Sequence, residues 1–144
     1  MQQVFVFLHV VGGVLMGFYF LLPFLIAASS KLSGASLAGY MSVMRTMNRV
    51  GQFGLIFELL TGGYLIPKYT YNIWWLIASL VLLVAMGAVT GIMGVRMKKL
   101  IDAATSGGSV DANRNSAAVL SWISAVFLLA IIFLMYSMAR GIAL

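Results

Sequence analysis

The sequence predicts an all-α protein, an integral membrane four-helix bundle, and three of its properties carry that prediction: composition, hydropathy and long apolar runs. Of the 144 residues, 62% are hydrophobic and only 8% are charged, and the mean hydropathy is +1.06. These values are far from the balance of a soluble domain. Each apolar run approaches or exceeds the roughly 20 residues that cross a hydrocarbon core. The runs span residues 4–28, 50–66, 73–95 and 117–139.

Each run is expected to become one helix of a single transmembrane domain covering residues 1–144. The first run is longer than the core of a secretory signal, and "MQQ" supplies no basic segment before it, so we expect a retained helix. Ser36 is the expected N-cap of a helix that runs into the second span and stops at Pro67. The polar stretch "DAATSGGSVDANRN" is expected to be a loop. The expected helices span about 4–28, 36–66, 73–99 and 115–140.

The cations are distributed asymmetrically along the chain. Lys68 and Arg140 lie on one side of the expected bundle, and the other seven of the nine cations lie in the two connections on the opposite side. By the positive-inside rule these two connections are cytoplasmic loops, and both termini are outside. The seven cations are Lys31, Arg45, Arg49, Arg96, Lys98, Lys99 and Arg114. The expected location is the bacterial cytoplasmic (plasma) membrane, which the chain crosses several times.

Composition also restricts the classes of function and partner. The net charge of +6 does not indicate nucleic-acid binding, because the cations alternate with apolar runs instead of gathering on a soluble face. The absence of cysteine excludes thiolate metal sites and thiol nucleophiles. No catalytic triad, carboxylate pair or phosphate loop is present, which disfavours hydrolytic and phosphoryl-transfer enzymes. The expected partners are the lipid bilayer and either further copies of the chain or a larger membrane complex.

Two ionisable residues lie inside apolar runs, and their spacing places both on stripes of small residues. Glu58 shares a helical face with Gly54, Gly62 and Thr61, and His9 shares one with Gly13. Small residues mark helix–helix contacts in membranes, so both groups are expected to face protein rather than lipid. Inside an apolar run, an ionised carboxylate without a partner is strongly disfavoured, because it loses its hydration. We therefore expect Glu58 either to hydrogen-bond with His9 or Thr61 in its neutral form or to share a proton with His9.

The first half of the chain resembles a group of bacterial membrane families. The resemblance rests on "FLHVVGGVLMGFYFLLP" at residues 7–23, on Arg45 and Arg49 ahead of the second span, and on "LTGGYLI" at residues 60–66. The nearest is a family of small four-helix proteins; HemJ-type protoporphyrinogen oxidases and copper-resistance D proteins are more distant. In the HemJ-type family the histidine of the first helix is associated with haem, which implies that role for His9. The lysine that those enzymes use in the third helix has no counterpart in this chain.

The candidate chemistry centres on haem b. His9 is the expected axial ligand to the iron, with Met16 or a histidine of a second subunit as the other ligand. Arg45 and Arg49 are candidate partners for the haem propionates, although the positive-inside rule also accounts for them. A lone histidine of this kind is equally compatible with a hydrogen-bonded packing residue.

Three other functions stay open from the sequence. Met41, Met44 and Met47 form a stripe that suits Cu(I), although methionine serves more often as apolar filler. A structural or accessory subunit of a larger membrane complex needs no cofactor. A small proton-linked transporter would use Glu58 as its catalytic, proton-carrying group. Whether the protein is an enzyme is left open.

Overall fold

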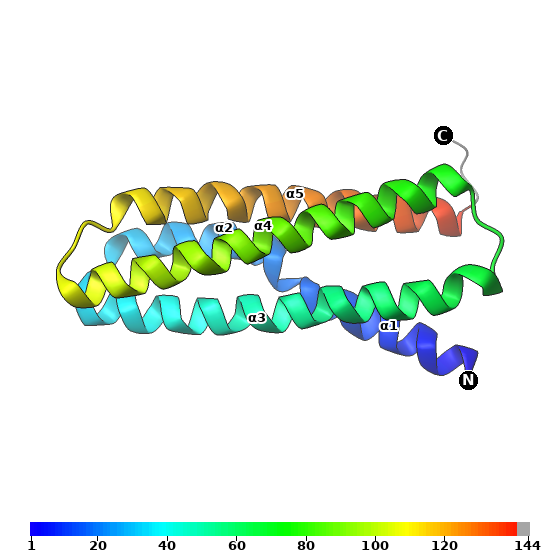
Figure 1. Ribbon diagram of the computed structural model, residues 1–144, viewed down its shortest axis with the longest axis horizontal. Coiled ribbons are helices and arrows are strands. Elements are labelled where there is room, and N and C mark those ends of the chain that lie inside the picture. Colours follow the sequence, from blue (N-terminus) through cyan, green and yellow to red (C-terminus); the bar gives the residue numbers. More distant parts are fainter. Residues whose placement is uncertain (141–144) are drawn as a thin grey trace.

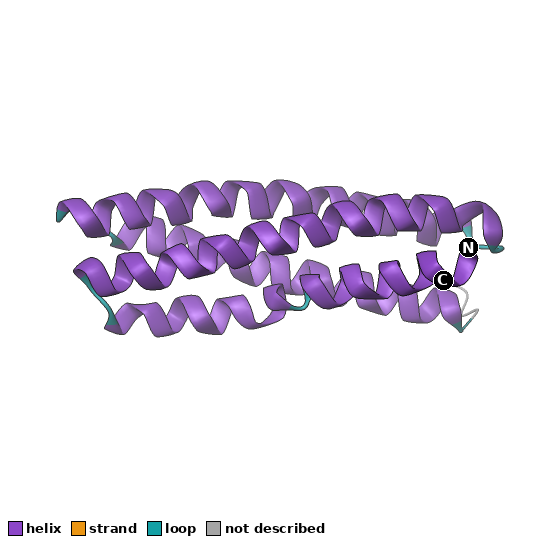
Figure 2. Cartoon of the chain, turned by 90° about the horizontal axis from the view of Figure 1, so that it is seen from below, coloured by secondary structure: helices purple, strands orange, loops and turns teal. Residues whose placement is uncertain are grey.

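The computed structural model describes residues 1–140, so the last four residues of the expected single domain lie outside the described part of the chain. The described residues form helices joined by short connections (Figures 1 and 2). The elements are α1 (Gln2–Met16), α2 (Phe18–Ala28), η1 (Ser29–Lys31), α3 (Gly34–Leu65), η2 (Ile66–Lys68), α4 (Ile73–Ser106) and α5 (Asp111–Ala139).

Four helical stretches are long and apolar enough to cross a membrane. They span Gln2–Lys31, Gly34–Lys68, Ile73–Ser106 and Asp111–Ala139. They lie alongside one another in an elongated bundle, with the N-terminus at the same end as the connection between α3 and α4 (Figure 1). The expected all-α fold is therefore confirmed, with four helices of the expected length and apolar character, and α4 packs against both α3 and α5.

The first span is broken, whereas the sequence led us to expect one helix over residues 4–28. The break is at Gly17, whose N–H bonds to the carbonyl oxygens of both Gly13 and Val14, a local tightening of the helix. Pro23 lies six residues further on, inside α2, where it cannot donate a backbone hydrogen bond and its ring crowds the preceding turn. Figure 2 shows the break as a short non-helical segment near the middle of the bundle.

The break divides the contacts of the first span between two neighbours. Its N-terminal half, α1, packs against α3, and its C-terminal half, α2, packs mainly against α5. As a result α1 and α5 diverge from each other toward the end of the bundle that holds the N-terminus (Figure 1). The candidate site lies in this divergence.

Several other helix boundaries differ from those that the sequence predicted. α3 begins at Gly34 with Ser33 as its N-cap, and not at the expected Ser36; it ends before Pro67, as expected. α4 continues to Ser106, where Gly107 closes it with a left-handed φ of 75°. The stretch expected to be a loop is therefore mostly helical, because Leu100 and Ala104 still pack in the core and α5 already begins at Asp111.

Methionine fills much of the core. Met41 and Met44 are buried in the apolar core cluster, whereas Met47 is 41% exposed. The methionine stripe considered for copper is thus divided between the core and the surface, and two of its members act as the flexible filler that methionine commonly provides. Two small residues of α5, Ala117 and Ser121, are fully buried, as small residues at a helix–helix contact are expected to be.

Candidate functional site

Two glycines let α1 and α3 approach closely beside the ionisable residues. A Cβ on Gly12 would lie 3.3 Å from the carbonyl oxygen of Gly54, and a Cβ on Gly54 would lie 3.0 Å from the carbonyl oxygen of Gly12. Any side chain at either position would push the helices apart. This contact holds the backbones of α1 and α3 at a separation that the side chains of His9 and Glu58 bridge directly.

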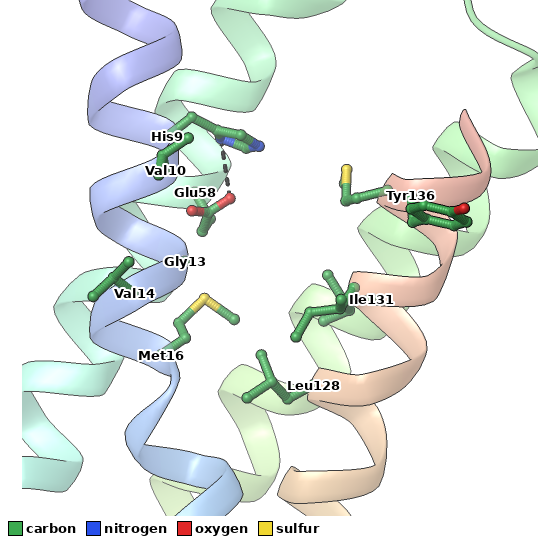
Figure 3. Close-up of a pocket in the computed structure, with 11 residues that line it drawn as sticks. His9, Val10, Gly13, Val14, Met16, Glu58, Leu128, Ile131 and Tyr136 are labelled. Atoms are coloured by element: carbon green, nitrogen blue, oxygen red, sulfur yellow. Dashed lines mark ion pairs between the residues drawn. The ribbon is translucent and has the colours of Figure 1, made fainter. Parts of the chain in front are cut away.

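His9 contacts three residues of α3. Its Nδ1 atom lies 3.0 Å from Glu58 Oε2 and 2.8 Å from Thr61 Oγ1. The ring lies over Gly62, where a Cβ would be 3.4 Å from Cε1. The contact between His9 and Glu58 that the small-residue stripes predicted is confirmed, and Figure 3 marks it with a dashed line.

The hydrogen bonds around Thr61 fix which nitrogen of His9 carries the proton. The Thr61 hydroxyl donates to the carbonyl oxygen of Phe57, so toward His9 it can only accept. Nδ1 must therefore be the protonated nitrogen, and it donates to Thr61 Oγ1 and Glu58 Oε2. In the neutral ring Nε2 then carries a free lone pair, and within residues 1–140 no protein group hydrogen-bonds to it.

The free nitrogen belongs to a ring that lines a cavity of about 450 Å³ between α1 and α5. Figure 3 shows His9 extending from α1 toward this space, with Leu128 and Ile131 of α5 on the far side. The cavity exists because the break at Gly17 turns α1 away from α5. Its other principal lining residues are Gly13, Met16, Glu58, Met135 and Tyr136.

Glu58 keeps one oxygen without a partner. Its Oε1 atom is buried and accepts no hydrogen bond in the described part of the chain. A Cβ on Gly12 would lie only 2.7 Å from this atom, whereas one on Gly13 would lie 3.5 Å away. Gly12 therefore makes the room that the carboxylate occupies, a role that spacing alone did not reveal.

The expected site residues fall into two places. His9, Glu58 and Met16 surround the same cavity. Arg45 and Arg49 do not join them, because they line a separate cleft between α3 and α4. These arginines precede Glu58 by nine or more residues, or at least about 13 Å along the helix.

Sequence reasoning missed a cation close to the cavity. The guanidinium carbon of Arg140 lies 5.5 Å from the ring centroid of Tyr136, and Tyr136 lines the cavity. The spacing of four residues on one helix was the available signal. In the sequence alone, Arg140 is a cation at the end of the fourth apolar run and indicates only topology.

We predict that Gly12→Ala displaces the Glu58 carboxylate from His9. The added Cβ overlaps Oε1, and relief requires either rotation of Glu58 or separation of α1 from α3, so we expect a loss of about 1–3 kcal/mol in the free energy of unfolding. Thermal unfolding of the purified protein measures this loss.

Gly87→Ala is the matched control, because a Cβ there meets no atom within 4 Å. It should leave stability unchanged or raise it by up to about 1 kcal/mol. Equal effects of the two substitutions would contradict the role assigned to Gly12.

Comparison of the chain with protein-family models, with curated proteins and with solved structures finds no match. The function is therefore inferred from the geometry of the site.

Proposed function

We propose that this chain is a multi-pass protein of the bacterial cytoplasmic membrane that binds haem b through Nε2 of His9. The observation that carries the proposal is the hydrogen bonding of the other ring nitrogen. A histidine that ligates a metal usually donates its second N–H to a carboxylate or another acceptor, which fixes the tautomer and raises the basicity of the ligand. His9 has this arrangement, with Glu58 and Thr61 as acceptors.

The walls of the cavity also suit a flat apolar group. Gly13 lies one turn beyond His9 on α1 and lines the cavity without a side chain, which leaves an open wall beside the imidazole. Leu128 and Ile131 supply an apolar surface opposite. A bound haem supplies one-electron redox chemistry, with a potential that its axial ligands and its surroundings set.

The chain offers further groups for the same ligand. Met135 lines the cavity from α5, on the wall opposite His9, and its thioether would be the second group to hold the haem. Met16 lies on the same helix as His9, so Met135 replaces it as the preferred second ligand. Arg140, beside Tyr136, takes the role of propionate partner that the sequence had suggested for Arg45 and Arg49.

The experiment that tests the proposal is an absorption spectrum of the purified protein before and after addition of haem b. We expect a Soret band that saturates at one haem per chain and shifts on reduction. A protein that stays colourless, and whose titration with haem gives no saturable band, would end the proposal.

One observation favours a second function, a small proton-linked transporter that uses Glu58. The unpartnered Oε1 atom can take up a proton while Oε2 keeps its contact with His9. Intramembrane carboxylates of this kind commonly carry protons. Proteoliposomes with and without a pH gradient distinguish this function, because a transporter moves protons across the membrane without bound haem.

We predict that both termini are outside the cytoplasm. The seven-to-two division of the nine cations is the reason, since cytoplasmic loops retain lysine and arginine. Reporter fusions after Leu144 and within the turn at Gly108 measure the orientation. A C-terminal reporter that is active in the cytoplasm would contradict this topology.

A further inference from the structure

A second cleft, of about 360 Å³, lies between α3 and α4 and is separate from the His9 cavity. Both helices place long polar side chains around it, and the floor on the α4 side is made of glycines. The polar lining residues are Arg45, Asn48, Arg49, Gln52 and Lys98, and the glycines are Gly91 and Gly94.

The lining carries three cations and no carboxylate. In the part of the chain that the structure describes, the close acid–base contacts are His9 with Glu58 and Arg114 with Asp111. Arg45, Arg49 and Lys98 are therefore in no ion pair, and Asp102, four residues after Lys98 on α4, does not line the cleft. Three unpaired cations around one concave surface produce a local positive potential that attracts an anion. The guanidinium group of each arginine is planar and has several N–H donors, an arrangement that suits the oxygen atoms of a phosphate.

A buried amide at the base of the cleft has an unused acceptor. Asn48 is only 1% exposed; its Nδ2 donates to the carbonyl oxygen of Thr90 at 3.1 Å, and its Oδ1 has no partner. Gly94 makes room for this amide, since a Cβ there would lie 3.1 Å from Nδ2. A buried acceptor without a donor lowers the stability of the fold. A ligand that suits this cleft therefore carries a hydrogen-bond donor as well as a negative charge.

Helix length places the cleft at the depth of lipid headgroups. α3 and α4 contain 32 and 34 residues, and about 20 of these cross the hydrocarbon core. Counted from the end of the bundle where these helices are connected, about 20 residues of α3 reach Thr46 and about 20 residues of α4 reach Ile92. Arg45 lies one residue beyond its limit and Lys98 six residues beyond its own, whereas Arg49 lies three residues inside, so the cations of the cleft bracket the depth at which phospholipid phosphates are found.

We propose that this cleft binds the phosphate of an anionic phospholipid whose headgroup also carries a hydroxyl, with Arg45, Arg49 and Lys98 on the phosphate and Asn48 Oδ1 accepting from the hydroxyl. An ammonium headgroup also offers donors, but three neighbouring cations repel it. The proposal rests on the membrane location proposed above and is independent of haem.

Lipid titration of the purified full chain in neutral detergent tests this site, with native mass spectrometry counting bound lipid. Three lipids with identical acyl chains are compared: phosphatidylglycerol, phosphatidylmethanol and phosphatidylcholine. We expect phosphatidylglycerol to bind about tenfold more tightly than phosphatidylcholine, because charge-assisted hydrogen bonds are the strong ones. Phosphatidylmethanol has the same charge but no hydroxyl, and should bind several-fold more weakly than phosphatidylglycerol.

Lys98 and Lys99 provide a matched pair of substitutions. Both are exposed neighbours on α4, but only Lys98 lines the cleft. Lys98→Gln should weaken phosphatidylglycerol binding at least threefold, Arg45→Gln should weaken it about tenfold, and Lys99→Gln should leave it unchanged. The melting temperature without lipid checks that each variant folds.

Three results would overturn the proposal. Equal weakening by Lys98→Gln and Lys99→Gln would mean that only the general positive field attracts lipid. Equal affinities for phosphatidylglycerol and phosphatidylmethanol would remove the role of Asn48. Displacement of the lipid by millimolar inorganic phosphate would show that the cleft takes the free anion instead. All of these readings are taken without haem, so failure here leaves the His9 proposal untouched.

Discussion

Replacing His9 with alanine is expected to weaken haem b binding more than about a hundredfold, since even the partners that orient a ligating histidine are worth about 10- to 100-fold. His9 is the only histidine in the chain, and cysteine is absent, so no other residue offers a strong axial ligand. Titration of the purified variant with haem, followed at the Soret band, measures the loss.

Two controls separate ligation from packing. Val10→Ala shortens another side chain of α1 that lines the cavity, but it removes no atom that could bind iron. It should change the dissociation constant for haem less than about threefold. Free imidazole should restore the band to the His9→Ala protein, because it supplies the missing nitrogen to the space left by the side chain. A variant that binds haem as the wild type does would show that His9 is a packing residue.

The sequence predicted the pairing of His9 with Glu58 because one physical rule governs both positions. Apolar surface gains little by leaving lipid, so small and polar residues mark the faces where membrane helices meet. Gly54 and Gly62 identified that face of α3, and Gly13 identified it on α1. Counted at about 1.5 Å per residue from Val4 and Ile66, the ends of the two runs on the same side of the bundle, His9 lies roughly 7 Å and Glu58 roughly 12 Å inside, which places the two groups within reach of each other.

The cavity could not be predicted in the same way. It depends on the break at Gly17, and neither glycine nor the proline six residues later obliges a helix in a membrane to break, because neighbouring helices can restore the lost hydrogen bonds. Hydropathy over residues 4–28 is continuous and carries no sign of the divergence. For the same reason, the opposite wall of the cavity, with Met135 and Tyr136, was not identified.

The location of Arg45 and Arg49 away from the His9 cavity could not be predicted for a different reason. The sequence places Arg45 and Arg49 before the second span, but a cytoplasmic anchor and a cofactor ligand look alike in a one-dimensional pattern. The long rise of α3 decides between the two, since Arg49 and Glu58 are nine residues apart, about 13 Å. Only the packing of α3 against α4 showed that these cations share a cleft with Lys98.

Glu58→Gln is expected to fold like the wild type and to bind haem about 10- to 100-fold more weakly, the range found when a partner of a ligating histidine is replaced. The amide oxygen of glutamine still accepts from Nδ1 of His9, which now lies 3.0 Å from Oε2. It carries no charge, so the imidazole becomes a poorer donor to iron. Haem titration together with thermal unfolding measures the two effects separately, and stability should fall by about 1 kcal/mol or less.

Glu58→Leu and Thr61→Val complete this test, because they distinguish a structural hydrogen bond from an electrostatic role. Leucine removes the acceptor and leaves Nδ1 bonded to Thr61 alone, so stability should fall by about 1 kcal/mol and haem affinity at least as far as in Glu58→Gln. Valine keeps the carboxylate and should weaken haem binding less than either change at Glu58. If Glu58→Gln binds haem with wild-type affinity, the charge has no part in ligation. If Glu58→Leu matches the wild type in both stability and affinity, the contact with His9 contributes to neither.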